Sequence, residues 1–394
     1  MSDTVILEGA RTPFGRLGGG LASLSAVELG SIAAGEAMKR SQVEAGDIDH
    51  LVMGQVLQAG SGQIPSRQVG FNIGLASTVT SDTINRVCGS GMRAVTLADL
   101  LISAGEYGTI IAGGMESMSN APYLLKNARF GYRMGNGELF DSMVDDGLTC
   151  AVAEVHMGIH GSNVAAENEC SRAVQDEFAY RSHMKAQAAY DEGRLPEEIV
   201  AVEIPGRRGQ VTVVERDEAI RPDTTVEALS NLRPVFDPEG SVTAGNAPGV
   251  NDGAAAMVVT SASHAAELGV KPLATIVAHA TSAWDVPYLA YTPQLAAEAA
   301  LAKAGMTIED MDVVEINEAF ASVAVISSGR LGIDPDSVNP ERWRDSDRAP
   351  DRCIRRSACP HAGLRTATAR RWHRAGGDLL RRRSGDAIIL RVDE

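Results

Sequence analysis

The sequence is poor in the features that mark several classes of protein. Its 394 residues include five cysteines, scattered and odd in number, which argues against a disulfide framework and suits a reducing cytoplasm. No run of 18 or more apolar residues is present, so we expect no membrane span. The first residues lack the basic and apolar regions of a secretory signal. We therefore expect a cytoplasmic protein with no membrane partner.

Lysine is also scarce, and much of the positive charge lies in one segment. The chain has 5 lysines, 31 arginines and a formal net charge of −15, which argues against nucleic acid as a partner. Thirteen of the arginines lie between residues 342 and 383. Because residues 341–384 carry +8, the remaining residues carry −23. No spacing of cysteine and histidine suits a metal ion, and we expect no metal site.

The order of apolar patterns predicts an α/β fold with parallel or mixed strands. Ser25 and Glu28 form a capping box before an apolar helix, and "HLVMGQV" follows as a buried strand. Strands "TSDTINRV" and "TIIAGGMESMS" come next. Farther along, Thr292 and Pro293 are typical of an N-cap and a first helical residue.

A second unit of the same order lies late in the chain. Residues 310–317, "DMDVVEIN", resemble residues 47–54, "DIDHLVMG", and each follows a helix and a turn. The pair favours a duplicated α/β domain, although helix–turn–strand units resemble one another in unrelated proteins. Residues 121–245, between the copies, are more polar and loop-like, which is typical of an insertion that covers a site.

Cys88 lies where a predicted strand meets a predicted apolar helix, in "INRVCGSGMRAVTLADLLISAG". The helix dipole and nearby N–H groups stabilise a thiolate at such a position. Gly89 and Gly91 allow a tight turn and the close approach of a substrate. This arrangement predicts a nucleophile. The alternative is a buried structural cysteine, the usual environment of a lone cysteine.

Five motifs, in order and spacing, resemble those of the thiolases. They are "RTPFG" (11–15), "NRVCGSG" (85–91), "GGMESMS" (113–119), "TAGNAPGVNDGAAA" (243–256) and "INEAFA" (316–321). The resemblance implies thiolase-like duplicated α/β domains in αβαβα layers. Residues 1–120 and 246–268 would form the N-terminal domain, 121–245 a loop domain over coenzyme A, and 269–394 the C-terminal domain. It also implies a homodimer or homotetramer.

The same resemblance implies an acyl-CoA acyltransferase, which condenses acyl-CoA molecules reversibly or thiolyses a 3-ketoacyl-CoA. Cys88 would hold the acyl group as a thioester, and Asn317 would orient a water that stabilises the oxyanion. Acyl-CoA and CoA would be the partners, with no tightly bound cofactor. The residues implied to line the CoA channel are His156, Met157, Arg221, Phe236, Pro248, Gly249 and Phe320.

Several of these channel residues have plainer alternatives. His156 is equally typical of a core histidine, Arg221 of a surface charge, and Phe236 and Phe320 of core phenylalanines. Pro248 departs from the family, which has a serine that contacts CoA at this position. Proline has neither an N–H nor a hydroxyl, so CoA affinity or register should differ.

The proton-transfer motifs of the family are missing from the sequence. Thiolases use a histidine in "GHP" to deprotonate the nucleophile and a cysteine in "C-x-G-G-G" to move the α-proton of acetyl-CoA, and neither motif is present. If the codons of these residues are read one base later, codons that encode residues 348–355 can also encode "GHPIGASG". In the same shifted frame, codons that encode residues 378–384 can encode "ICSGGGQ". Glycine codons displaced by one base in a GC-rich gene also become arginine codons. We therefore predict a frame displacement within residues 341–384, which leaves Ala349 and Leu379 where the histidine and cysteine belong.

Two other functions stay open at this point. The literal sequence fits a catalytically impaired acyl-CoA-binding homologue. A nucleic-acid-binding protein would use the arginine-rich segment and show salt-dependent affinity, but the acidic remainder argues against it.

Peptide mapping of the last 60 or so residues, with the intact mass, tests the frame displacement. An ordinary thiolase yields peptides containing "GHP" and "CSGGG". Peptides containing "RWR" and "CIRR" would contradict normal catalysis.

Overall fold

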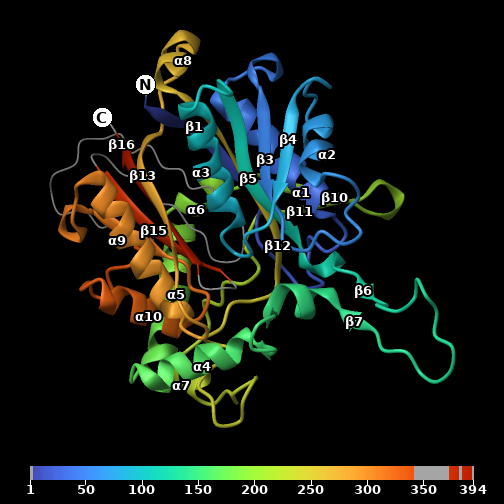
Figure 1. Ribbon diagram of the computed structural model, residues 1–394, viewed down its shortest axis with the longest axis vertical. Coiled ribbons are helices and arrows are strands. Elements are labelled where there is room, and N and C mark those ends of the chain that lie inside the picture. Colours follow the sequence, from blue (N-terminus) through green and yellow to red (C-terminus); the bar gives the residue numbers. More distant parts are fainter. Residues whose placement is uncertain (1–2, 341–371, 381–383, 393–394) are drawn as a thin grey trace.

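The chain folds around one mixed sheet with helices on both faces, which confirms the predicted α/β class (Figure 1). The computed structural model describes residues 3–340, 372–380 and 384–392, with the backbone alone for 372–380 and 384. Within these residues ten strands belong to the sheet. Most of the segment for which we predict a frame displacement lies outside the described residues.

One half of the sheet comes from the first 261 residues, in the order β1-β12-β5-β3-β4. β3 runs parallel to both β4 and β5, so the carboxyl ends of these strands lie at one edge. β12 runs antiparallel to β1 and β5 and begins at that same edge. The bounds are β1 (Thr4–Arg11), β2 (Gly15–Arg16), β3 (His50–Gly54), β4 (Thr80–Ile84), β5 (Thr109–Ser117) and β12 (Asn251–Ser261).

The other half has the order β14-β15-β16-β13 and joins the first half through a short contact. Val5 and Ile6 of β1 pair with Thr275 and Ala274 of β13. β14 is parallel to β15, and β16 is antiparallel to both its neighbours. The bounds are β13 (Ala274–Ala283), β14 (Val313–Ile316), β15 (Trp372–Leu380) and β16 (Ser384–Val392).

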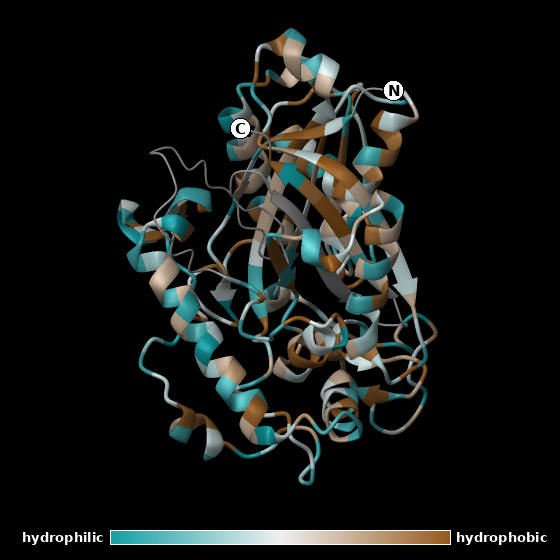
Figure 2. Cartoon of the chain, turned by 90° about the vertical axis from the view of Figure 1, so that its left-hand side faces the viewer, coloured by the Kyte–Doolittle hydropathy of each residue, from teal (hydrophilic) through white to brown (hydrophobic). Residues whose placement is uncertain are grey.

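Alternating side chains of the strands form separate apolar cores on the two faces. Leu51 and Met53 of β3 pack with α1 (Ala26–Ser41) and α2 (Pro65–Asn72), whereas Val52 packs with α3 (Ser90–Ser103). The core around α3 also contains Ile388 and Leu390 of β16, so α3 lies between the two halves. Hydrophobic colour follows the strands in Figure 2. Strands such as β3 and β12 have nearly continuous apolar sequences because helices cover both faces of the sheet.

The two halves repeat one local order. In the first, α1 is followed by η1 (Ala45–Asp47) and β3; in the second, α9 (Thr292–Ala304) is followed by η6 (Ile308–Asp310) and β14. Both short 3₁₀ turns carry a capping box. This repetition supports the duplication, while the exact domain bounds stay a prediction.

The sequence predicted the start of α1 correctly and the N-cap of α9 one residue too late. Ser25 and Glu28 form the predicted capping box of α1. Thr292 is not the N-cap of α9 but its first residue, and the cap is Tyr291. The reason is that η5 (Leu289–Tyr291) leads directly into the helix, so the Thr292 hydroxyl donates back to the Leu289 carbonyl.

The region between β5 and β12 forms smaller elements beside the sheet (Figure 1). The segment between β6 and β7 projects away from the rest of the chain in Figure 1, and α4 and α7 lie below the sheet. The bounds are η2 (Met118–Asn120), β6 (Tyr123–Leu124), β7 (Phe140–Asp141), η3 (Met143–Leu148), β8 (Thr149–Cys150), β9 (Val155–His156), α4 (Met157–Glu167), α5 (Arg172–Asp191), α6 (Arg194–Glu198), β10 (Val202–Pro205), η4 (Arg207–Gly209), β11 (Val211–Val214) and α7 (Val226–Ser230). After β12 come α8 (Ala262–Leu268) and, beyond β14, α10 (Ala321–Arg330).

Candidate active site

A cavity of about 420 Å³ lies where the two halves of the sheet meet the covering region. Its wall includes Met92 of α3, Ile388 of β16 and residues 315–318 at the carboxyl end of β14. Helix α5 and residues 219–221 supply the covering side. Cavities at the carboxyl ends of strands are common ligand sites in α/β proteins.

Four of the predicted site residues lie on this wall: Asn317, Arg221, Pro248 and Gly249. Asn317 directly follows β14 and is buried, which places a polar amide at the end of an apolar strand. Arg221 is exposed, and its backbone N–H donates to Nδ1 of His183 at 3.4 Å. Pro248 lines the cavity with a ring that has neither an N–H nor a hydroxyl, and its effect on CoA binding stays a prediction.

Four other predicted channel residues form a cluster beside the described cavity wall. The rings of His156 and Phe236 stack with centroids 4.0 Å apart, and Met157 and Phe236 pack against the apolar core that contains buried Phe320. His156 also caps α4, because its Nδ1 accepts from the Gly158 N–H at 3.1 Å. Their role in lining the CoA channel stays a prediction, and the structure gives each of them a packing role.

Cys88 is the most accessible of the three cysteines that the structure describes. It is half-buried, whereas Cys150 and Cys170 are buried. Burial raises the pKa of the Cys170 thiol to about 11, which makes this thiol a poor nucleophile at neutral pH. Cys88 itself lies four residues beyond β4 and two residues before the start of α3.

The turn that carries Cys88 has an unusual backbone. Val87 has a φ of 49°, a left-handed conformation that is a genuine outlier for a β-branched residue. The Ser90 hydroxyl donates to the Val87 carbonyl at 2.6 Å and accepts from the Arg86 N–H at 2.8 Å. The Asn85 side chain accepts from the Val87 N–H at 2.9 Å. These bonds hold Cys88 at a sharp strand-to-helix elbow.

Close packing under the elbow depends on a glycine at the end of β3. A Cβ on Gly54 would lie 2.5 Å from the Ser90 side chain and 2.9 Å from the Gly91 backbone nitrogen. No real Cβ tolerates such distances, so Gly54 lets α3 begin directly against the strand. The sequence shows this glycine, but its need is visible only once β3 and α3 are side by side.

A buried glutamate supports the elbow from behind. Glu116 of β5 accepts from the Val56 N–H at 2.8 Å and from the Leu57 N–H at 3.3 Å. The Val56 carbonyl in turn accepts from the Asn85 side chain at 3.2 Å. Glu116 therefore holds the loop after β3, this loop holds the side-chain amide of Asn85, and Asn85 holds the backbone next to Cys88.

The elbow is also tied to the second half of the sheet. Arg86 Nε lies 3.0 Å from Oδ2 of Asp386 on β16. Burial raises the pKa of Asp386 to about 6, although the positive charges of Arg86, Arg93 and His279 oppose this rise. The same strand supplies Ile388 to the cavity wall. Cys88 thus lies at the seam between the two halves.

Most residues of the cavity wall had no predicted role, and three of them show why. Phe14 belongs to the quoted "RTPFG" motif, which carried a signal but no assigned role. Met92 falls in the apolar stripe of α3 and is indistinguishable there from a core residue. His183 lies on α5, whose pattern is mostly polar.

Replacement of Glu116 tests the support of the elbow. Glu116→Gln keeps the shape but puts an amide N–H against backbone N–H groups, so we expect a loss of about 1–3 kcal/mol in unfolding free energy. We also expect slower alkylation of Cys88 by iodoacetamide. The control Glu36→Gln removes a partly exposed partner of Arg40 on α1 and should cost at most about 0.5 kcal/mol. Equal alkylation rates in both variants would contradict the proposed link.

Two family models match the chain. A family model described as the thiolase N-terminal domain matches residues 4–263, and one described as the thiolase C-terminal domain matches residues 270–342. The second match ends where the arginine-rich segment begins.

Curated relatives match the chain over most of their length. This chain is 46% identical over 339 residues to an acetyl-CoA acetyltransferase of Cupriavidus necator, with 86% of each chain covered. It is 44% identical over 340 residues to an acetyl-CoA acetyltransferase of Escherichia coli, again with 86% of each chain covered. A probable acetyl-CoA acyltransferase of Staphylococcus epidermidis is 43% identical over 339 residues, with the same coverage. The chain therefore belongs to the thiolase family.

Proposed function

We propose that this protein is an acyl-CoA acyltransferase that carries the acyl group on Cys88. The observation that supports this most is the elbow, which presents a half-buried thiol at the start of α3 and is tied to the strand that lines the cavity. The names of the relatives, acetyl-CoA acetyltransferase and acyltransferase, fit this chemistry.

In the first step the Cys88 thiolate attacks the carbonyl carbon of an acyl-CoA thioester. The new carbon–sulfur bond forms as the bond to the CoA sulfur breaks, and the CoA thiolate leaves with the electron pair. N–H groups at the start of α3 and a water held by Asn317 would stabilise the oxyanion of the intermediate. In the second step the α-carbon of acetyl-CoA, or the sulfur of CoA, loses its proton to a base and attacks the acyl carbon. The carbon–sulfur bond to Cys88 breaks, and the Cys88 thiolate leaves with the electron pair.

Recognition of CoA would use residues of the described cavity wall, on which Cys88 itself does not lie. Arg16 and Arg221 bring positive charge to the wall, which suits the phosphates of CoA. Pro248 and Gly249 offer a close backbone approach without a hydroxyl. We propose CoA thioesters as substrates and no tightly bound cofactor.

The two steps need a general base that deprotonates Cys88 and a shuttle that moves the α-proton of acetyl-CoA, and the family supplies both from residues after 341. We propose that the displaced frame has removed both from the printed sequence. The family match to the C-terminal domain that stops at residue 342 supports this proposal. Restoring the frame would put a histidine and a cysteine in place of Ala349 and Leu379.

We also propose that the protein forms a homodimer or homotetramer. β4 is an edge strand whose residues are exposed or half-buried, and free strand edges are sites of pairing between chains. In the projecting segment after β6, the side chains of Phe130 and Met134 are 91% and 96% exposed (Figure 1).

Within the described residues no helix is long and apolar enough to cross a membrane. A cytoplasmic location stays a prediction from the scattered cysteines.

Thiolysis of acetoacetyl-CoA by free CoA tests the function. We expect the chain with residues 341–384 in the restored frame to form acetyl-CoA, and its Cys88→Ser variant to lose about 10³-fold or more in rate. The chain as printed should bind CoA but turn over slowly. No thiolysis by the restored chain would contradict the proposal, and CoA binding alone would favour the impaired homologue.

Replacement of Pro248 tests its part in CoA recognition. Pro248→Ser restores an N–H and a hydroxyl on the cavity wall, and one added hydrogen bond should tighten CoA binding by about threefold to tenfold. Pro248→Ala restores the N–H alone and serves as the control. Isothermal titration with CoA measures both, and weaker binding by the serine variant would contradict this role.

A further inference from the structure

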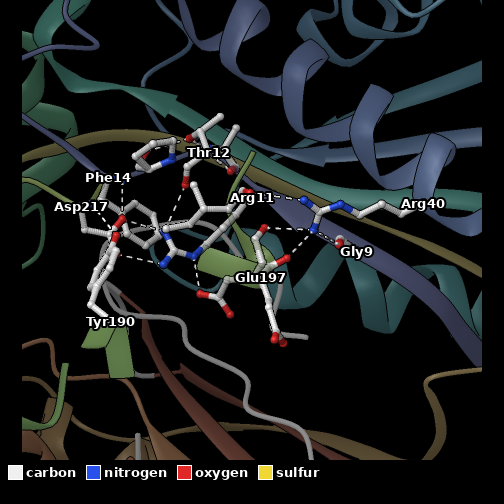
Figure 3. Close-up of polar contacts among 12 residues, drawn as sticks. Gly9, Arg11, Thr12, Phe14, Arg40, Tyr190, Glu197 and Asp217 are labelled. Carbon is white, nitrogen blue, oxygen red and sulfur yellow. Dashed lines mark hydrogen bonds and ion pairs between the residues drawn. The ribbon is translucent and has the colours of Figure 1, made fainter. Parts of the chain in front are cut away.

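A buried arginine behind the cavity joins three distant parts of the chain (Figure 3). Arg11, the last residue of β1, is 3% exposed. Its Nε donates to Oε1 of Glu198 at 2.5 Å. Its two terminal nitrogens donate to the two carboxylate oxygens of Asp217 at 2.7 and 2.9 Å. We call Arg11, Glu198 and Asp217 the arginine clasp.

Complementary charge is what allows the clasp to be buried. Burial alone would lower the pKa of Arg11, but the carboxylates of Asp217 and Glu198 outweigh it, and the net shift is upward. A buried charge without such partners is strongly unfavourable. The planar guanidinium meets the Asp217 carboxylate with two parallel hydrogen bonds, a geometry that lysine cannot reproduce.

Asp217 passes this constraint to both sides of the cavity wall. Its Oδ1 also accepts from the Phe14 N–H at 2.8 Å, and the Glu218 N–H donates to the Phe14 carbonyl at 2.9 Å. The Glu218 carboxylate accepts from the N–H groups of Arg16 and Gly20 at 2.8 and 3.0 Å. Residues 217–218 are thus fastened to residues 14–20.

The fastened segments carry cavity residues, whereas Arg11 does not reach the described wall. Phe14 and Arg16 line the cavity from the segment that follows β1, and residues 219–221 line it from the segment that follows β11. Behind them the Tyr190 hydroxyl accepts from the Asp217 N–H at 2.7 Å. Arg11 also lies 4.8 Å from the centre of the Phe14 ring, measured from its guanidinium carbon.

The Glu198 side of the clasp has a separate anchor. Arg40 of α1 donates to the Glu197 and Ile199 carbonyls at 3.0 and 3.3 Å, which holds the end of α6 (Figure 3). Within the clasp, therefore, the bonds to Asp217 connect Arg11 to the cavity wall. The bond to Glu198 connects Arg11 to α6, which Arg40 also holds in place.

We propose that Arg11 is a positioning residue for CoA recognition, which fixes Phe14 and residues 219–221 on the cavity wall through Asp217. The inference rests on the proposed function, because it takes CoA as the ligand of this cavity. It assigns a role to the arginine of "RTPFG" that the chemistry at Cys88 does not use.

The test measures two properties of the full chain: the dissociation constant for CoA by isothermal titration, and the rate of Cys88 alkylation by iodoacetamide. Arg11→Lys keeps the charge but loses the pair of parallel hydrogen bonds to the Asp217 carboxylate, so we expect CoA binding to weaken about tenfold. The alkylation rate should stay within about twofold, because Glu116 and Ser90 hold the elbow separately.

Two further variants keep the test decisive. Tyr190→Phe removes one hydrogen bond to Asp217 and should weaken CoA binding about threefold, even if Arg11→Lys does not fold. The matched control Glu198→Gln keeps a hydrogen-bond acceptor for Arg11 and should lower the melting temperature while CoA binding stays within about twofold.

The outcomes separate this inference from the proposed function. CoA binding by the unaltered chain, with equal affinity in Arg11→Lys and Tyr190→Phe, overturns the positioning role alone. Equal weakening by Glu198→Gln, or a parallel loss of the alkylation rate, shows a general structural role and also overturns it. No CoA binding by the unaltered chain overturns both the proposed function and the inference.

Discussion

The left-handed backbone at Val87 is the constraint on which the site depends. A β-branched residue in this conformation costs on the order of 1–3 kcal/mol, and nearby bonds offset the cost. Ser90 and Asn85 bind the turn directly, and Glu116 supports Asn85 through the loop after β3. The result is a thiol held between the end of a strand and the start of a helix, where partial positive charge favours the thiolate.

A second constraint concerns the cover. The wall of the cavity comes from segments as distant in the sequence as Phe14 and Leu390, and short loops alone cannot keep such segments in register. The arginine clasp supplies that register from behind, through a buried guanidinium and Asp217. Arg86 and Asp386 play a comparable part between the elbow and β16. Buried charges thus occur at the seams of this fold, where apolar packing alone leaves the relative position of the parts loosely specified.

The sequence predicted the parts that depend on local patterns. The capping box of α1, strands β4 and β5, and a strand-to-helix junction at Cys88 follow from periodicity and glycine positions. It could not predict the partners of Arg11, because Glu198 and Asp217 are 187 and 206 residues away. Phe236 and Phe320 show the other limit, since a core aromatic and a channel aromatic have the same pattern. Val87 gave no signal, because its type argues against the conformation it adopts.

The account stands on the acyl group residing on Cys88, and one measurement tests this directly. The chain with residues 341–384 in the restored frame is incubated with acetyl-CoA, digested with pepsin at low pH, and its peptides are analysed by mass spectrometry. We predict one acetyl group on the peptide that contains Cys88 and none on the peptides of Cys150 and Cys170, with loss of the label in Cys88→Ser. An acetyl group on Cys150 or Cys170, or a label that survives Cys88→Ser, would contradict the account.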